Sequence, residues 1–171
     1  MSEPLRESLL SVRWLRTHTQ QLFHDLPFIV SETEDLRFVK RSHNMLVMTA
    51  TPDSGTTRSS RPSLVIGHLK SDAPIDDRMA LSHSQLTQVK SLEVLEILDE
   101  GETKVAGIHA YHILAKARNI ASGDIVVFHQ ILVFQEYRYL LIHSSVKENA
   151  SAVYQPQFAA VVASLKFKQV R

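Results

Sequence analysis

The stretch from Gly123 to Val146 reads GDIVVFHQILVFQEYRYLLIHSSV, and it decides the fold class. Apolar side chains recur with a period of two in both halves, which is the pattern of β-strands. The residues around Glu136 separate the halves and predict a short turn, so the two strands form an antiparallel hairpin. His129 and His143 stand where apolar residues are expected. These histidines either form a functional site or occupy ordinary structural positions in the sheet.

Further strands are predicted on both sides of this hairpin. LRFVK, MLVMTAT and SLVIGHL precede it, and an exposed loop over residues 52–62 interrupts that series. From Leu92 onward, EVLEIL, a turn at Asp99–Gly101, TKVAG and IHAYHILAKAR predict an antiparallel meander, with another turn at Asn119–Gly123. The acidic residues Asp99, Glu100 and Glu102 then lie at a solvated hairpin tip, and their spacing does not match a calcium loop.

Three helices are predicted around this sheet. The first runs from Leu5 to Phe23 with Pro4 in its first turn, and it packs on the sheet or on a second subunit. The second follows caps at Ser71 and Asp72, with Pro74, Asp76 and Asp77 in its first turn. The third is YQPQFAAVVASL, where Tyr154, Phe158, Val161, Val162 and Leu165 form an apolar face and alanines permit close approach. Helices on an antiparallel sheet make an α+β domain.

Composition excludes several classes of function. The 171 residues carry 19 basic and 18 acidic side chains, so a net charge of +1 does not favour nucleic acid or an acidic membrane. There is no cysteine, which removes disulfides, thiolate metal sites and cysteine nucleophiles. The N-terminal residues lack the apolar core of a signal peptide, and we expect a cytoplasmic protein if Met1 is the native start.

Catalytic motifs are absent from the sequence. There is no G-x-S-x-G elbow, no phosphate-binding glycine loop and no H-E-x-x-H helix. Ser144 and Ser145 follow His143 directly, so adjacency in a strand does not pair them with it as nucleophile and base. We therefore expect no enzymatic activity and no cofactor.

Residues 63–168 resemble the PsbP-like superfamily. The resemblance rests on the order of elements from SLVIGHL to the closing YQPQFAAVVASLKF, on Gly107 with Ala110, on Gln130, and on the terminal helix from Phe158 to Leu165. That superfamily includes photosystem extrinsic proteins, a Ran-binding import factor and bacterial effector-associated chaperones. The resemblance implies an α/β/α sandwich, which we assign to residues 26–171. The additional N-terminal helix over residues 1–25 departs from the pattern of the superfamily. It also implies a module that binds other proteins and shares no catalytic residues.

The histidines support an alternative function. If residue numbers across the Glu136 turn sum to about 272, His129 faces His143, and the preceding turn brings His112 within one residue of facing His129. Three imidazoles on adjacent strands could bind zinc, nickel or copper. A shift of one residue would instead send a histidine to the other face of the sheet.

We predict a non-enzymatic protein-binding module, adaptor or chaperone-like, whose partner is of unknown identity, with self-association through the N-terminal helix as a further expectation. The predicted partner surface comprises Trp14, Tyr111 and Tyr139, because amphipathic aromatic side chains suit interfaces. The alternative is a small-ligand or metal-binding protein that uses His112, His129 and His143.

Overall fold

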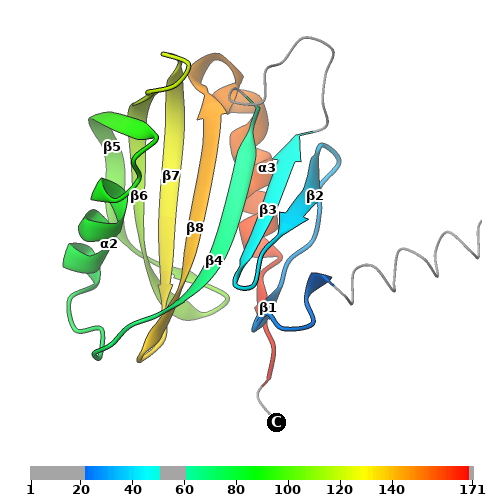
Figure 1. Ribbon diagram of the computed structural model, residues 1–171, viewed down its shortest axis with the longest axis vertical. Coiled ribbons are helices and arrows are strands. Elements are labelled where there is room, and N and C mark those ends of the chain that lie inside the picture. Colours follow the sequence, from blue (N-terminus) through cyan, green and yellow to red (C-terminus); the bar gives the residue numbers. More distant parts are fainter. Residues whose placement is uncertain (1–21, 51–60, 170–171) are drawn as a thin grey trace, which may run out of the picture.

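The computed structural model describes residues 22–50 and 61–169 (Figure 1). The predicted N-terminal helix, with Trp14, lies outside these residues except for its C-terminal end. Most of the predicted loop over residues 52–62 lies outside them as well. The described residues form a layered domain in which one large sheet stands between two helices (Figure 1).

The large sheet has seven antiparallel strands in the order β2-β3-β4-β8-β7-β6-β5. A small second sheet pairs β1 with β9. Every strand region predicted from the alternating pattern is present. The strands are β1 (Phe28–Ile29), β2 (Leu36–Arg41), β3 (Met45–Ala50), β4 (Ser63–Lys70), β5 (Leu92–Val105), β6 (Ile108–Asn119), β7 (Ile125–Phe134), β8 (Arg138–Lys147) and β9 (Lys166–Phe167).

The two described helices cover opposite faces of the sheet, and the predicted α+β class is confirmed. Helix α2 (Arg78–Thr87) lies over β6 and β7, whereas α3 (Ser151–Ala163) follows a single 3-10 turn at Glu148–Ala150 and lies on the other face (Figure 1). Helix α2 begins later than predicted. Its N-cap is Asp77, whose carboxylate accepts a hydrogen bond of 2.9 Å from the Ala80 amide, so Pro74 and Asp76 precede the helix.

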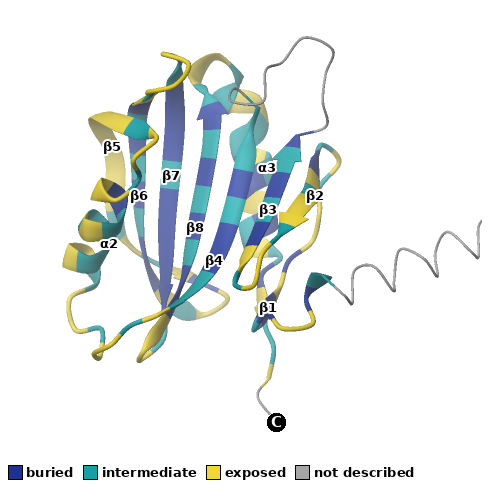
Figure 2. Ribbon diagram, viewed as in Figure 1, coloured by how far each residue is buried: buried dark blue, intermediate teal, exposed yellow. Residues whose placement is uncertain are grey.

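Each face of the sheet has its own apolar core. The core beneath α3 is the larger, and it includes Ile142, Val146, Phe158, Val161 and Leu165. The core beneath α2 comprises Leu86, Tyr111, Ile113, Phe128, Leu132, Phe134 and Tyr139. Figure 2 shows buried positions running along β6, β7 and β8, which are the strands between the two helices. Successive residues of these central strands therefore enter different cores.

The β5–β6 hairpin turns at a different place from the one predicted. Asp99–Gly101 does not form a turn; it lies within β5, which continues for 14 residues to Val105. The connection is Ala106–Gly107, and both residues have positive φ, at 50° and 77°. Positive φ at both central residues is the requirement of the two-residue turn that matches strand twist, and glycine supplies it at little cost. Paired strands on both sides of this turn outweigh the local turn propensity of Gly101.

The acidic residues of β5 are consequently not at a hairpin tip. The Glu100 carboxylate lies 2.7 Å from His83 Nε2, and the Glu102 carboxylate lies 3.4 Å from the Arg78 guanidinium. Both partners belong to α2. The carboxylates therefore tie the helix to the edge of the sheet, although their exposure limits the contribution of each pair to about 0–1 kcal/mol.

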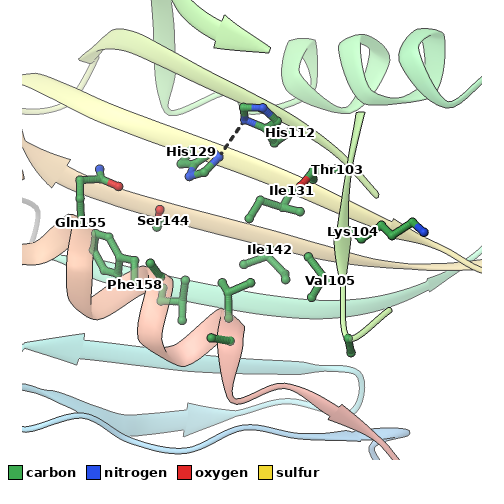
Figure 3. A pocket seen from close by; sticks show the side chains of 15 residues that line it. Thr103, Lys104, Val105, His112, His129, Ile131, Ile142, Ser144, Gln155 and Phe158 are labelled. Carbon is green, nitrogen blue, oxygen red and sulfur yellow. Dashed lines mark hydrogen bonds between the residues drawn. The ribbon is translucent and has the colours of Figure 1, made fainter. Parts of the chain in front are cut away.

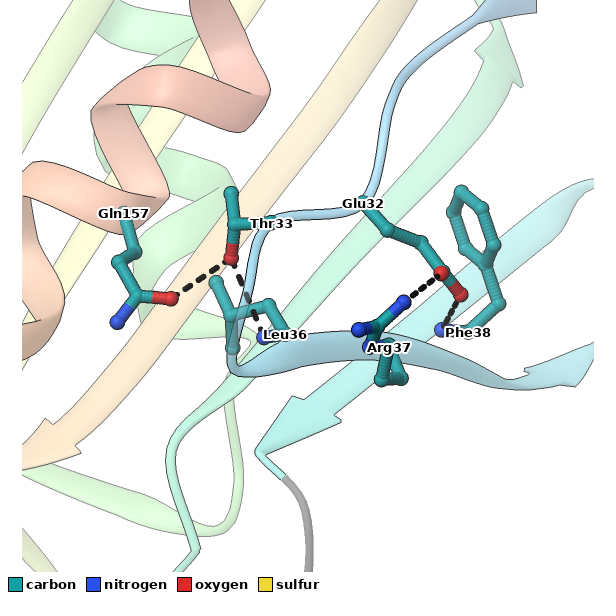
Figure 4. Close-up of polar contacts among 6 residues, drawn as sticks. All are labelled: Glu32, Thr33, Leu36, Arg37, Phe38 and Gln157. Carbon is teal, nitrogen blue, oxygen red and sulfur yellow. Dashed lines mark hydrogen bonds and ion pairs between the residues drawn. The ribbon is translucent and has the colours of Figure 1, made fainter.

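Polar contacts hold α3 to the segment between β1 and β2 (Figure 4). The Thr33 hydroxyl donates to Gln157 Oε1 at 2.7 Å, and Gln157 Nε2 donates to the Asp35 carboxylate at 2.7 Å. Glu32 closes the same segment by accepting from the Phe38 amide and from Arg37, both at 2.9 Å. A single side chain of α3, Gln157, is thus bonded at both ends of its amide. These bonds fix the position of the helix above the sheet.

Candidate functional site

The strand register separates the histidines that were predicted to face each other. Across the β7–β8 hairpin, His129 pairs with Ser144 and Gln130 pairs with His143. The predicted register is therefore wrong by one residue, and a shift of one residue reverses the face to which a side chain points. His129 lies on the α3 face, and His143 lies on the α2 face with Gln130.

His143 belongs to a buried polar chain that connects β8, β7 and α2. Its Nε2 lies 3.0 Å from Gln130 Oε1, and Gln130 Nε2 donates to the Ser82 carbonyl at 2.7 Å. The Phe128 ring packs edge-on at a centroid distance of 4.9 Å. Burial lowers the pKa of His143 from 6.5 to about 4. The imidazole is therefore neutral at neutral pH and donates its Nε2 proton to Gln130.

His112 and His129 form a pair on the opposite face. His129 Nε2 lies 3.3 Å from His112 Nδ1, and their rings meet at an interplanar angle of 76° (Figure 3). Burial lowers the pKa of His129 to about 4, with His112 acting in the same direction and Asp99 opposing it. The Asp99 carboxylate lies 3.8 Å from His112 Nε2 and favours a proton there. His112 Nδ1 then accepts from His129, which leaves His129 Nδ1 as an acceptor.

The three predicted metal ligands do not converge. The thickness of the sheet separates His143 from the other two, and the described residues contain no group of three or more histidine, aspartate or glutamate side chains that could hold a metal ion. A pair of imidazoles alone lacks the three protein ligands of a catalytic zinc site.

A pocket of about 580 Å³ lies between α3 and the sheet, and the histidine pair forms part of its wall (Figure 3). Its apolar lining comes mainly from β4, β7, β8 and α3. Ala159 and Ala163 line it, so these small side chains, predicted to allow close packing, leave open space instead. The lining comprises Leu64, Thr103, Lys104, Val105, Ala106, His112, His129, Ile131, Ile142, Ser144, Gln155, Phe158, Ala159, Val162 and Ala163.

The tyrosines of the predicted partner surface are not at the surface. Tyr111 and Tyr139 are each 6% exposed and belong to the core beneath α2. Burial raises the pKa of both hydroxyls. The prediction assumed an open sheet face at these positions, whereas α2 covers it. The third member of that surface, Trp14, lies outside the described residues.

The edge strand β5, which was predicted as a strand of the meander, exposes apolar side chains. Val94, Leu95, Ile97 and Leu98 are between 38% and 47% exposed. Positions 93–100 are exposed without alternation, so neither face of this stretch is covered (Figure 2). Among the described strands, only β6 pairs with β5. The outer edge of β5 therefore carries unpaired backbone N–H and C=O groups. In the sequence, the apolar run VLEIL was the only feature that could have indicated this exposed apolar strand.

Comparison with known proteins places the fold. No family model matches the sequence, and no curated protein matches it either. LpqN of Mycobacterium tuberculosis, described as involved in cell envelope biogenesis, is a structural neighbour with a TM-score of 0.61 and 10% identity, and the match covers 83% of each chain. Cyanobacterial PsbP from Synechocystis has a TM-score of 0.50 at 10% identity, with 80% of this chain and 94% of that chain covered. The chain has a PsbP-like fold.

A third neighbour with this PsbP-like fold is PA94 of Pseudomonas aeruginosa, described as a protein of unknown function and putative regulator. It has a TM-score of 0.57 at 14% identity over 80% of this chain and 99% of that chain. The PsbP-like fold predicted from the sequence is therefore shown, although identities of this size establish the fold alone. No helix within residues 22–50 and 61–169 is long and apolar enough to cross a bilayer.

Proposed function

We propose that this chain is a non-enzymatic protein-binding module that engages an extended segment of its partner along β5. The observation that carries the proposal is the exposure of residues 93–100 of the edge strand β5, on both faces of the strand. The family that the sequence resembles acts by binding other proteins, which supports a function of this class.

Edge strands attract other strands because their outer N–H and C=O groups are unpaired. A partner segment that adds to β5 gains main-chain hydrogen bonds, and its side chains gain contacts with apolar residues such as Leu95 and Leu98. Exposed apolar side chains clustered on one strand mark an interaction site more strongly than the same residues scattered singly. Glu93 precedes the run from Val94 to Leu98 and Glu96 interrupts it, and charges of this kind limit indiscriminate strand pairing.

The irregularities of β5 suit a selective site. The register with β6 shifts between Val94 and Glu96 and again between Ile97 and Asp99. Such bulges bend and twist the edge, so a partner must match a particular shape as well as supply a strand. Selectivity therefore comes from the bulged, apolar middle of the strand.

The test is affinity capture from the native host with the tagged full-length chain, followed by mass spectrometry. Leu95→Lys and Leu98→Lys are expected to lose a stoichiometric partner that the wild type retains. Val153→Lys is the matched control, because Val153 is an apolar residue 61% exposed on α3 and distant from β5 in the chain. An unchanged set of partners in the β5 variants would contradict the proposal.

Self-association is measured in parallel by light scattering of the purified chain. No self-association through β5 is expected, because the proposal assigns this edge to a different protein. A dimer that Leu98→Lys abolishes would show that β5 binds a second copy of this chain, and it would overturn that assignment.

A further inference from the structure

The pocket beneath α3 has two chemically different ends. In Figure 3, Gln155, Ser144 and His129 lie toward one side together with the Phe158 ring. Ile131 and Ile142 lie toward the other side, next to Val105 and Thr103. An apolar cavity with a few polar groups at one end is the usual form of a small-molecule site, and about 580 Å³ is within the range of such sites.

The polar end offers both a donor and an acceptor. The Gln155 Nε2 atom is buried and has no hydrogen-bond partner among the described residues. A buried donor without a partner costs about 1–3 kcal/mol, which a ligand would recover by accepting from it. His129 Nδ1 is an acceptor in the tautomer favoured by Asp99, in which His129 Nε2 donates to His112 Nδ1. The Ser144 hydroxyl, which also lines the pocket, can do either.

The polar end carries no charge to balance an ionised head group. Burial keeps His129 neutral, with its pKa lowered to about 4. Lys104 lines the rim, but Figure 3 shows its side chain extending away from the other labelled residues. A buried carboxylate or ammonium without a counter-ion is far more costly than a hydrogen-bonded neutral group. An uncharged head group therefore fits this end best.

The apolar end fits an alkyl chain. Ile131, Ile142 and Val105 supply the wall, and the pocket has open space where α3 presents Ala159 and Ala163. Each methylene that leaves water for such a wall contributes about 0.8 kcal/mol.

We propose that this pocket binds an uncharged single-chain amphiphile with an amide or hydroxyl head group. The head lies among Gln155, Ser144 and His129, and the alkyl chain lies along Ile131, Ile142 and Val105. The site is independent of the exposed middle of β5, so the failure of either proposal leaves the other standing.

The test is isothermal titration calorimetry of the full chain with decanamide, decanol and decanoate. Decanamide and decanol are expected to bind at least tenfold more tightly than decanoate. Gln155→Met keeps the length of the side chain without its donor and should weaken decanamide binding by roughly three- to tenfold, the usual effect of one hydrogen bond. Ala159→Leu fills the pocket and should weaken binding at least tenfold, whereas Val153→Leu, on an exposed position of α3, should leave it unchanged.

Nuclear magnetic resonance of methyl-labelled protein gives a measurement that does not depend on variants. Decanamide should shift the methyl signals of Ile131, Ile142 and Val162 and leave those of Leu86 and Leu132 unmoved, because the latter pair lies in the core beneath α2. Shifts confined to the α2 core, no binding of either neutral ligand, or binding of decanoate equal to that of decanamide would overturn the proposal.

Discussion

His143 should make the stability of this protein depend on pH in a defined window. Its pKa is lowered from 6.5 to about 4 in the folded chain, because burial disfavours the charged imidazolium. The unfolded chain therefore takes up a proton near pH 6.5, whereas the folded chain does so only near pH 4. This contribution to stability is complete above about pH 6.5 and is lost progressively as the pH falls toward 4.

The size of the loss follows from the shift. One pKa unit corresponds to about 1.4 kcal/mol. Relative to neutral pH, the pKa shift of His143 alone therefore lowers the free energy of unfolding by about 2 kcal/mol at about pH 5 and by about 3 kcal/mol at about pH 4. A loss of this size is a large part of the 5–15 kcal/mol typical of a folded domain. His129, with its pKa also lowered to about 4, adds a loss in the same direction.

The assay is urea unfolding followed by far-ultraviolet circular dichroism at several pH values. His143→Gln isolates the contribution of this residue, because glutamine can still donate to Gln130 Oε1 but does not titrate. Between about pH 7.5 and about pH 5, the wild type should lose about 2 kcal/mol more than the variant. His109→Gln, at an exposed position of β6, is the control and should retain the wild-type dependence.

Parallel pH profiles for the wild type and His143→Gln would refute this reasoning. Such a result would mean that the His143 ring reaches water in the folded state.

Three further predictions concern the elements that carry the two proposed sites. Gln157→Leu breaks the bonds to Thr33 and Asp35 and should lower the free energy of unfolding by about 1–3 kcal/mol, measured by urea titration. Gly107→Ala forces a side chain into a backbone with φ of 77° and should cost about 1–2 kcal/mol in a thermal melt; the matched change Gly101→Ala meets no heavy atom within 4 Å and should cost less. Leu95→Lys lies on an exposed edge and should change stability by less than about 0.5 kcal/mol, so a loss of partner binding cannot be attributed to unfolding.

The alternating pattern predicted the sheet, but it did not predict the register of the β7–β8 hairpin. The turn is centred between Glu136 and Tyr137, and the predicted turn was centred on Glu136. That half-residue difference moves His143 to the other face. The apolar run through Leu140, Leu141 and Ile142 has no alternation that fixes the phase of β8, because both faces of this strand contact a core.

The two candidate sites were missed for a different reason. The VLEIL run of β5 has the composition of an interior strand, and only the order of strands in the folded chain shows that it is an edge. The pocket likewise depends on which side chains face Ala159 and Ala163 across a gap. Neither arrangement is a property of a local segment, whereas the strand regions and the two described helices follow from local periodicity. The PsbP-like fold was expected from the resemblance of the order of elements, and it is confirmed.

Site-specific photo-crosslinking in the native host tests the central claim most directly. Benzoylphenylalanine replaces Leu98 on β5 in one strain and Val153 on α3 in another, since both positions are exposed and apolar. A discrete crosslinked adduct with a second protein at Leu98, absent at Val153, is the predicted result. Adducts at Val153 alone, or none at Leu98, would contradict the assignment of β5 as the binding edge.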